Sequence, residues 1–220
     1  MRNLKIRKGR LAAVGLVMAV LAGTTGQALA ANHLVDGINL DNGVTGESVA
    51  LNLVAKDGYI SGPEGNSIYI WGLADGDAGR NPTGTPQYPA PTIILDQGDT
   101  LTITLENQLP AKYSIAPASM PVSLVFPGQT GITTGGGSAG AITQEAAPNG
   151  GTVTYTFTAS KPGTFIYNSG TQPALQSQMG IVGAIIVRPL GFNAADPTTW
   201  KAYNDTVPAG ETVADSAFDH

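Results

Sequence analysis

The sequence predicts an all-β protein, a Greek-key β-sandwich of two packed sheets. Three observations predict this fold class. Apolar and polar residues alternate over short runs, turn-forming residues separate these runs, and no long stretch has the 3.6-residue period of an amphipathic helix. Glycine and proline account for 29 and 15 of the 220 residues, and 42% of the residues are hydrophobic. This combination favours a folded, turn-rich β protein over a disordered chain.

The first predicted strands lie upstream of a long loop. Residues 48–55 alternate between apolar and polar side chains, which is the period of a half-buried strand. Residues 67–73 are rich in β-branched and aromatic side chains, so they predict a second strand. Residues 75–91 combine glycine and proline with acidic and polar residues, and they predict a loop.

A hairpin is the clearest local pattern. A strand over residues 92–95 is followed by a turn over 96–99, in which Gly98 supplies the backbone freedom that the turn needs. The alternating run over 100–105 then predicts the returning strand.

The second half of the chain predicts four more strands. The last is almost fully apolar, which suits the centre of a sandwich. A glycine-rich loop is expected over residues 127–151, and residues 175–179 could form one helical turn. The four strands are expected over residues 121–126, 152–158, 164–167 and 180–187.

The chain has the pattern of an exported protein. A basic segment and an apolar run over residues 11–21 precede Ala28-Leu29-Ala30, which is the pattern of a signal peptide spanning residues 1–30. An uncleaved N-terminal anchor is the alternative, but the apolar run is short for a membrane span. We expect a periplasmic, cell-surface or extracellular location. The basic residues are Arg2, Lys5, Arg7, Lys8 and Arg10.

Three regions follow the predicted signal peptide. Residues 31–48 predict a polar leader or a short edge strand, residues 49–189 the folded domain, and residues 190–220 a polar linker or tail.

The charge and the lack of cysteine exclude several functions. Cleavage would remove five of the 11 basic residues and no acidic one, leaving six basic and 16 acidic residues and a net charge of −10. A nucleic-acid partner is excluded because phosphate binding needs a basic face. With no cysteine, the chain forms no disulfide and cannot supply the thiolate of a blue-copper site.

Several segments, in order, resemble the first, N-terminal domain of multicopper oxidases. The resemblance spans roughly residues 50–189 and implies a cupredoxin-like Greek-key β-sandwich, which agrees with the strand pattern. The segments are Pro89–Ile93, Gln97–Leu101, Glu106–Pro110, Asn149–Phe157, Lys161–Tyr167 and Met179–Val187.

The resemblance also implies where copper would bind. In the family, this domain supplies two His-x-His pairs to a three-copper cluster. The matching positions here carry Val125 and Pro127 in the first pair, and Asn168 and Gly170 in the second. None of these is an imidazole, thiolate or carboxylate, and imidazole is the commonest ligand for copper. We therefore expect no catalytic residue and no cofactor in the sandwich.

One metal site remains as a hypothesis outside the sandwich. The chain has two histidines, His33 and His220, one in each tail. Cleavage after Ala30 would leave His33 as the third residue. The free amine, two amides and the imidazole can then hold Cu(II) or Ni(II) in a square plane. Chance placement of His33 is the simpler interpretation, and cleavage one residue later would destroy the site.

Two other sets of residues are interpreted as structural rather than as metal ligands. Met120 and Met179 predict gap-filling core residues rather than copper ligands. Asp75, Asp77 and Asn81 lie in a glycine-rich loop that lacks the closing glutamate of a calcium loop, so a solvated loop is expected.

Three functions stay open. The first is a non-catalytic domain, a structural or interaction module of a larger oxidase-like protein that meets further cupredoxin domains or a partner. The second is a copper-binding protein, or part of a split multicopper oxidase whose copper sites lie in a missing C-terminal part or a partner. This alternative draws on Ala217–His220, which resembles the approach to a second domain. The third is a surface-assembly β-module unrelated to copper. Oxidase activity is implied only by the family resemblance.

Overall fold

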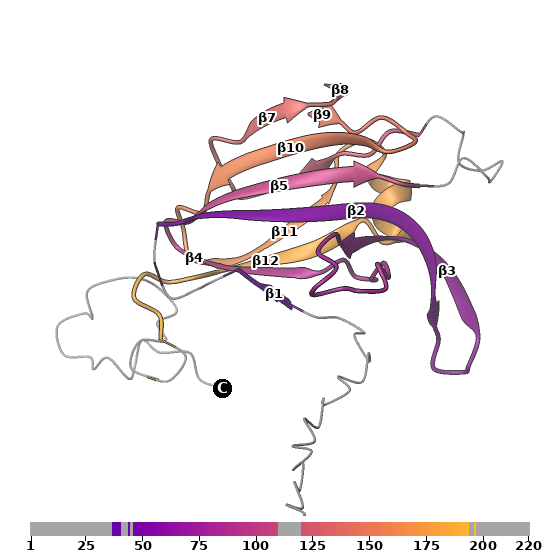
Figure 1. The fold of residues 1–220 in the computed structure, drawn as a ribbon, viewed down its shortest axis with the longest axis horizontal. Coiled ribbons are helices and arrows are strands. Elements are labelled where there is room, and N and C mark those ends of the chain that lie inside the picture. The colour runs from indigo at the N-terminus through magenta and orange to yellow at the C-terminus, as the bar shows by residue number, and fades with distance from the viewer. Residues whose placement is uncertain (1–36, 41–43, 45, 110–119, 194–195, 197–220) are drawn as a thin grey trace, which may run out of the picture. The chain divides into compact units, whose positions relative to one another are not determined.

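The computed structural model describes residues 37–40, 44, 46–109, 120–193 and 196. Within these residues, two five-stranded sheets lie against each other as layers (Figure 1). We call them sheet I and sheet II. Sheet I has the order β1-β4-β12-β11-β6, and its strands are β1 (Gly37–Asn39), β4 (Thr92–Asp96), β12 (Val182–Arg188), β11 (Gly163–Ser169) and β6 (Leu124–Val125).

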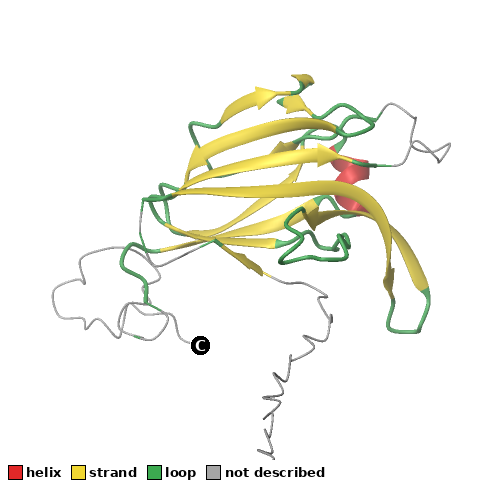
Figure 2. Ribbon diagram, viewed as in Figure 1, coloured by secondary structure: helices red, strands yellow, loops and turns green. Residues whose placement is uncertain are grey.

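Sheet II has the order β3-β2-β5-β10-β7. A small separate ribbon pairs β8 (Ser138–Ala139) with β9 (Gln144–Glu145). Helical structure among the described residues lies at one short π-helical turn, η1 (Pro173–Ser177), and the residues just after it. Strands make up most of the fold (Figure 2). The strands of sheet II are β3 (Ser67–Asp75), β2 (Ser48–Ser61), β5 (Thr100–Asn107), β10 (Gly151–Thr158) and β7 (Thr133–Gly136).

The core lies between the sheets because strand residues alternate in direction. In β5 and β10 every second side chain is buried, and the two strands pair antiparallel over their full lengths, so both present the same face inward. Burying a large apolar side chain stabilises the fold by about 1.5–3 kcal/mol. The largest fully buried side chains are Tyr155, Tyr167, Phe157, Leu51, Leu53, Leu73, Ile93, Leu95, Leu101, Ile103, Leu105 and Leu124.

A buried carboxylate fixes the turn between β4 and β5. Asp99 is 1% exposed, and its two oxygens accept hydrogen bonds from the backbone N–H groups of Gly46, Glu47 and Asp96 at 2.9–3.1 Å. Gly98 beside it has a φ of 100°, which a residue with a side chain rarely adopts. The predicted turn is therefore confirmed, and it also holds the start of β2.

The structure confirms the all-β sandwich and corrects parts of the strand prediction. The expected loop over residues 127–151 is wrong in part, because it contains β7, β8 and β9. The strand expected over 121–126 is shorter, with only Leu124–Val125 in β6 and an isolated bridge from Val122 to Ala146. β2 continues to Ser61, six residues past the expected end.

Several expected regions fall largely outside the described residues. The signal peptide lies there entirely, as does most of the tail after residue 193. In the leader, β1 forms the short edge strand that was one of the two alternatives, and it pairs parallel with β4. Across the residues that are described, no helix has the length and apolar character needed to cross a membrane.

Candidate metal centre

Tertiary structure brings together the two segments to which the family resemblance assigns the copper-ligand pairs. β6 and β11 are antiparallel neighbours at the edge of sheet I, and Val125 lies directly opposite Asn168. The Gly170 N–H donates to the Ser123 carbonyl at 3.2 Å, which continues the pairing by one step. Of the positions that the resemblance assigns to the two His-x-His pairs, Val125 and Asn168 therefore meet on one strand pair, although they are 43 residues apart in sequence.

The side chains at these positions do not fit a copper cluster. Val125, Pro127 and Gly170 have no side-chain donor atom, and the amide of Asn168 donates to the carbonyl of Ser169 at 3.1 Å. Gly170 is tightly enclosed, since a Cβ there would lie 2.8 Å from Val125 Cγ1 and 2.9 Å from Ser123 Oγ. Among the described residues, no group of three or more His, Cys, Asp or Glu is placed to hold a metal ion.

A hydrogen-bonded network occupies the space behind these positions. Gln176 of η1 is fully buried; its amide accepts from Ser169 Oγ at 2.6 Å and donates to the Pro121 carbonyl at 3.0 Å. Ser123 Oγ and Thr171 Oγ1 lie 2.9 Å apart. All these groups have partners, so the network anchors η1 to β11 and leaves no buried side chain among them in need of a ligand.

Two buried tyrosines brace the same region from the core. The hydroxyl of Tyr155 donates to the Gln144 carbonyl at 2.7 Å and accepts from the Leu124 N–H at 3.1 Å, so it ties β10 to β9 and β6. The Tyr167 hydroxyl donates to the Pro91 carbonyl. Burial raises the pKa of Tyr155 to about 12 and also raises the pKa of Tyr167. Both hydroxyls therefore stay protonated as structural donors at neutral pH.

Apolar side chains lie together on the outer face of sheet I, with Thr164, Asn168 and Arg188 on the same face. In β12 the half-buried residues Val182, Ala184 and Ile186 alternate with buried ones, so they point away from the core. Ile166 of β11 lies opposite Ala184 and is 54% exposed, and Val125 lies on the same side. The nearly continuous apolar character of residues 180–187, noted in the sequence, is the signal for this second apolar face.

The outer face of sheet II is polar where β5 and β10 form it. Threonines of β5 and β10 alternate with the buried core residues and face outward in opposed pairs. Thr100 and Thr158 are joined at 3.0 Å between hydroxyl oxygens, and Thr102 and Thr156 at 3.1 Å. The outer face of sheet II is therefore polar over β5 and β10, although β2 and β3 of the same sheet expose Tyr59 at 63% and Ile68 at 45%. Exposed apolar patches mark interaction sites.

The other predicted residues separate into three groups. His33 and His220 lie outside the described residues. Met120 is buried and Met179 packs against the core, which confirms their structural interpretation. The solvated-loop interpretation is wrong for Asp75, which is 4% exposed and binds Arg80, because that loop folds back onto the sheet.

Comparison with known proteins gives a consistent set of relatives. A family model described as multicopper oxidase matches residues 78–191. An iron transport multicopper oxidase (fetC) of Epichloe festucae is 37% identical over 108 residues, which are 48% of this chain and 16% of the relative. An L-ascorbate oxidase of Brassica rapa subsp. pekinensis is 33% identical over 119 residues, 54% of this chain and 19% of the relative. The matched part thus spans less than a fifth of each of these relatives.

The solved structures agree on the fold. A laccase from Pediococcus acidilactici superposes with a TM-score of 0.50 and 18% identity, covering 70% of this chain and 30% of the laccase. At this identity the likeness shows the fold alone, a cupredoxin-like sandwich, which confirms the fold expected from the sequence.

Proposed function

Because the chain belongs to the multicopper oxidase family, whose model matches residues 78–191, we propose that it is an exported, non-catalytic cupredoxin-like domain. It acts as a structural or interaction module of a larger oxidase-like protein. It lacks the ligands of the three-copper cluster, and it meets further cupredoxin domains or a partner protein through the outer face of sheet I.

The pairing of Val125 with Asn168 carries this proposal. The backbone keeps the arrangement in which two strands could present ligands to one metal ion, but the side chains at these positions are aliphatic or neutral. Gly170 adds a steric argument, since a side chain there would displace Val125 or Ser123. A domain with this geometry and these residues contributes a surface to its assembly rather than a redox centre.

The apolar outer face supports the interaction role. An isolated sandwich gains nothing from exposing Ile166 and half-burying Ile186 on its outer surface, whereas a docked domain would remove this area from water. The threonines that cover β5 and β10 of sheet II need no such cover. Ile166 therefore marks the face that we propose for docking.

Copper content tests the non-catalytic assignment. The full chain is purified, stripped of metal, incubated with excess Cu(II) and desalted, and its copper is counted beside a His33→Ala variant. We expect no stoichiometric copper in the His33→Ala protein. Copper retained by that variant at one or more ions per chain would mean that the sandwich holds metal, and the proposal would be wrong.

Site-specific crosslinking tests the docking face. A photoreactive residue is placed at Ile166 on the apolar face or at Thr152, which is exposed on the opposite sheet, and the chain is irradiated in the producing cells. We expect a crosslink from position 166 to a cupredoxin-domain protein, identified by mass spectrometry, and none from position 152. Equal crosslinking at both positions, or none at 166, would contradict the proposed face.

A second function remains for the mature N-terminus. If cleavage follows Ala30, His33 carries one Cu(II) independently of the sandwich. The observation that favours it is the Ala31-Asn32-His33 sequence that follows the predicted cleavage signal. One copper ion lost on His33→Ala substitution, in a protein whose N-terminus is verified by intact mass, would support this function. Retention of that ion would exclude it.

A further inference from the structure

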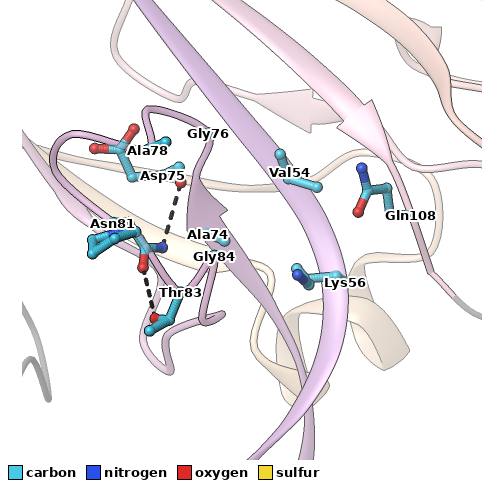
Figure 3. Close-up of a pocket in the computed structure, with 11 residues that line it drawn as sticks. Val54, Lys56, Ala74, Asp75, Gly76, Ala78, Asn81, Thr83, Gly84 and Gln108 are labelled. Carbon is cyan, nitrogen blue, oxygen red and sulfur yellow. Dashed lines mark hydrogen bonds between the residues drawn. The ribbon is translucent and has the colours of Figure 1, made fainter.

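A pocket lies on the outer face of sheet II, away from β6 and β11. The segment 76–87 folds back over the middle of β2 and the C-terminal part of β3 and borders an open hollow of about 310 Å³, close to the lower limit for small-molecule sites (Figure 3). Val54 and Ala74 contribute methyl groups to its wall. Its polar side chains include Lys56, Asp75, Asn81, Thr83 and Gln108.

Internal hydrogen bonds hold the loop in place, so the pocket is preformed. The Asn81 amide donates to the Thr85 carbonyl at 3.1 Å and accepts from the Thr85 N–H at 3.2 Å. At the ends of the segment, the Gly76 N–H donates to the Asn52 carbonyl at 2.8 Å and the Gln87 N–H to the Leu73 carbonyl at 3.0 Å. A ligand would therefore not have to order this loop on binding.

The acidic side chains beside the pocket are held by partners of their own. Arg80 binds Asp75 through two of its nitrogens, and a third lies 2.9 Å from a carboxylate oxygen of Asp77. The hydrogen bond to Asp75 raises the pKa of Arg80, so its guanidinium stays charged. With one guanidinium and two carboxylates, the cluster has a formal net charge of −1. Glu106 of β5 accepts from the Gln108 amide at 2.7 Å and does not line the pocket.

Lys56 differs from the other described basic residues. Arg80 and Arg188 are held in ion pairs, and Lys161 is exposed in the turn before β11. Lys56 is half-buried and takes part in none of the ion pairs found among the described residues. Its ammonium extends from β2 toward the loop, where a Cβ on Gly84 would lie 3.4 Å from it (Figure 3). A partly buried ammonium favours an anionic partner.

We propose that this pocket binds small organic carboxylates, with the Lys56 ammonium as counter-ion and the methyl groups of Val54 and Ala74 against the body of the ligand. The site combines a positive charge at one side with an apolar wall, in a chain whose net charge is otherwise negative. The proposal goes beyond the interaction role above and does not depend on it, because no residue of the pocket belongs to sheet I.

Benzoate and its uncharged amide, benzamide, test the site on the full chain. Titrations followed by calorimetry, and by NMR of the Val54 and Ala74 methyl groups, are compared for the native protein, Lys56→Met and Lys161→Met. The two variants change the net charge equally, so they separate a local charge at the pocket from the overall charge. Thermal melting confirms that each variant is folded.

We expect saturable benzoate binding that shifts both methyl signals, and benzamide binding at least tenfold weaker. Lys56→Met should weaken benzoate binding at least tenfold, and Lys161→Met should leave it within twofold of native. Absence of saturable benzoate binding would overturn the proposal. So would equal binding of benzoate and benzamide, or an equal effect of the two lysine variants.

Discussion

Two histidines placed across β6 and β11 should create a metal site where the native side chains offer none. The change is Val125→His with Asn168→His, in a His33→Ala background. The two positions are directly opposed in an antiparallel pair, so their Cβ atoms lie about 4.5–5.5 Å apart. Metal–imidazole bonds of about 2.0–2.1 Å allow both rings to bind one ion at this separation.

The expected gain in stability follows from the coupling between metal binding and folding. A metal at 100 times its dissociation constant stabilises the folded state by about 2.7 kcal/mol if it binds only that state. For a domain of this size, 1 kcal/mol shifts Tm by about 2–4 °C, so Zn²⁺ should raise Tm by about 5–10 °C. Loss of the Asn168 side-chain bond to Ser169 lowers the starting stability by about 1 kcal/mol. The metal-dependent shift is therefore the quantity to compare.

The assay is thermal unfolding with increasing Zn²⁺, with stoichiometry from calorimetry. Because both imidazoles must be neutral to bind, the shift should vanish as the pH falls below about 6.5. Val125→His with Thr164→His is the matched control, since Thr164 lies four residues from Asn168 along β11, about 13 Å away. A folded double variant without a Zn²⁺ shift, or an equal shift in the control, would refute the reasoning from strand pairing.

Three further changes test the packing that supports these strands. Gly183→Ala should destabilise the protein by about 1–3 kcal/mol, because its Cβ would lie 2.5 Å from the Tyr167 ring; an unchanged urea midpoint would contradict this contact. Asp99→Ala leaves three backbone N–H groups without their acceptor, of which that of Asp96 is buried, and should cost about 1–3 kcal/mol, measured by urea unfolding; a loss below about 0.5 kcal/mol, the usual range of a neutral surface change, would show that water replaces the carboxylate. With its pKa raised by burial to about 12, Tyr155 keeps its proton in the folded state while the unfolded chain ionises near pH 10, so its contribution is present at neutral pH and is lost as the pH rises from about 10 to 12. Absorbance and unfolding measured over this range check the sign, and Tyr155→Phe should flatten that pH dependence.

Strands in which apolar and polar residues alternate could be predicted from the sequence. Successive side chains of a strand point to opposite faces, and only one of these faces is buried. The alternation in β5 and β10 predicted both strands and the buried face of each. β7, β8 and β9 were missed because their residues are glycine, threonine and other small or polar types that are almost all exposed. β7 is a strand because it pairs with the backbone of β10, and no apolar pattern in its own sequence marks this.

The end of β2 has a similar explanation. Its alternating core residues stop at Ala55, where pairing with β5 also stops. Beyond that residue the strand continues only because it remains paired with β3 as far as Ser61. A local pattern ends where burial ends, whereas a strand ends where its hydrogen-bonded partner does.

The sequence by itself determined the fold class and the family, because these depend on periodicity and on ordered local motifs. Only the tertiary structure decided that Val125 meets Asn168, that apolar side chains lie together on one outer face, and that Lys56 faces a pocket beneath a folded-back loop. Each of these joins residues from separate segments, and the distances between such segments are set by sheet pairing and loop packing rather than by neighbours in the chain.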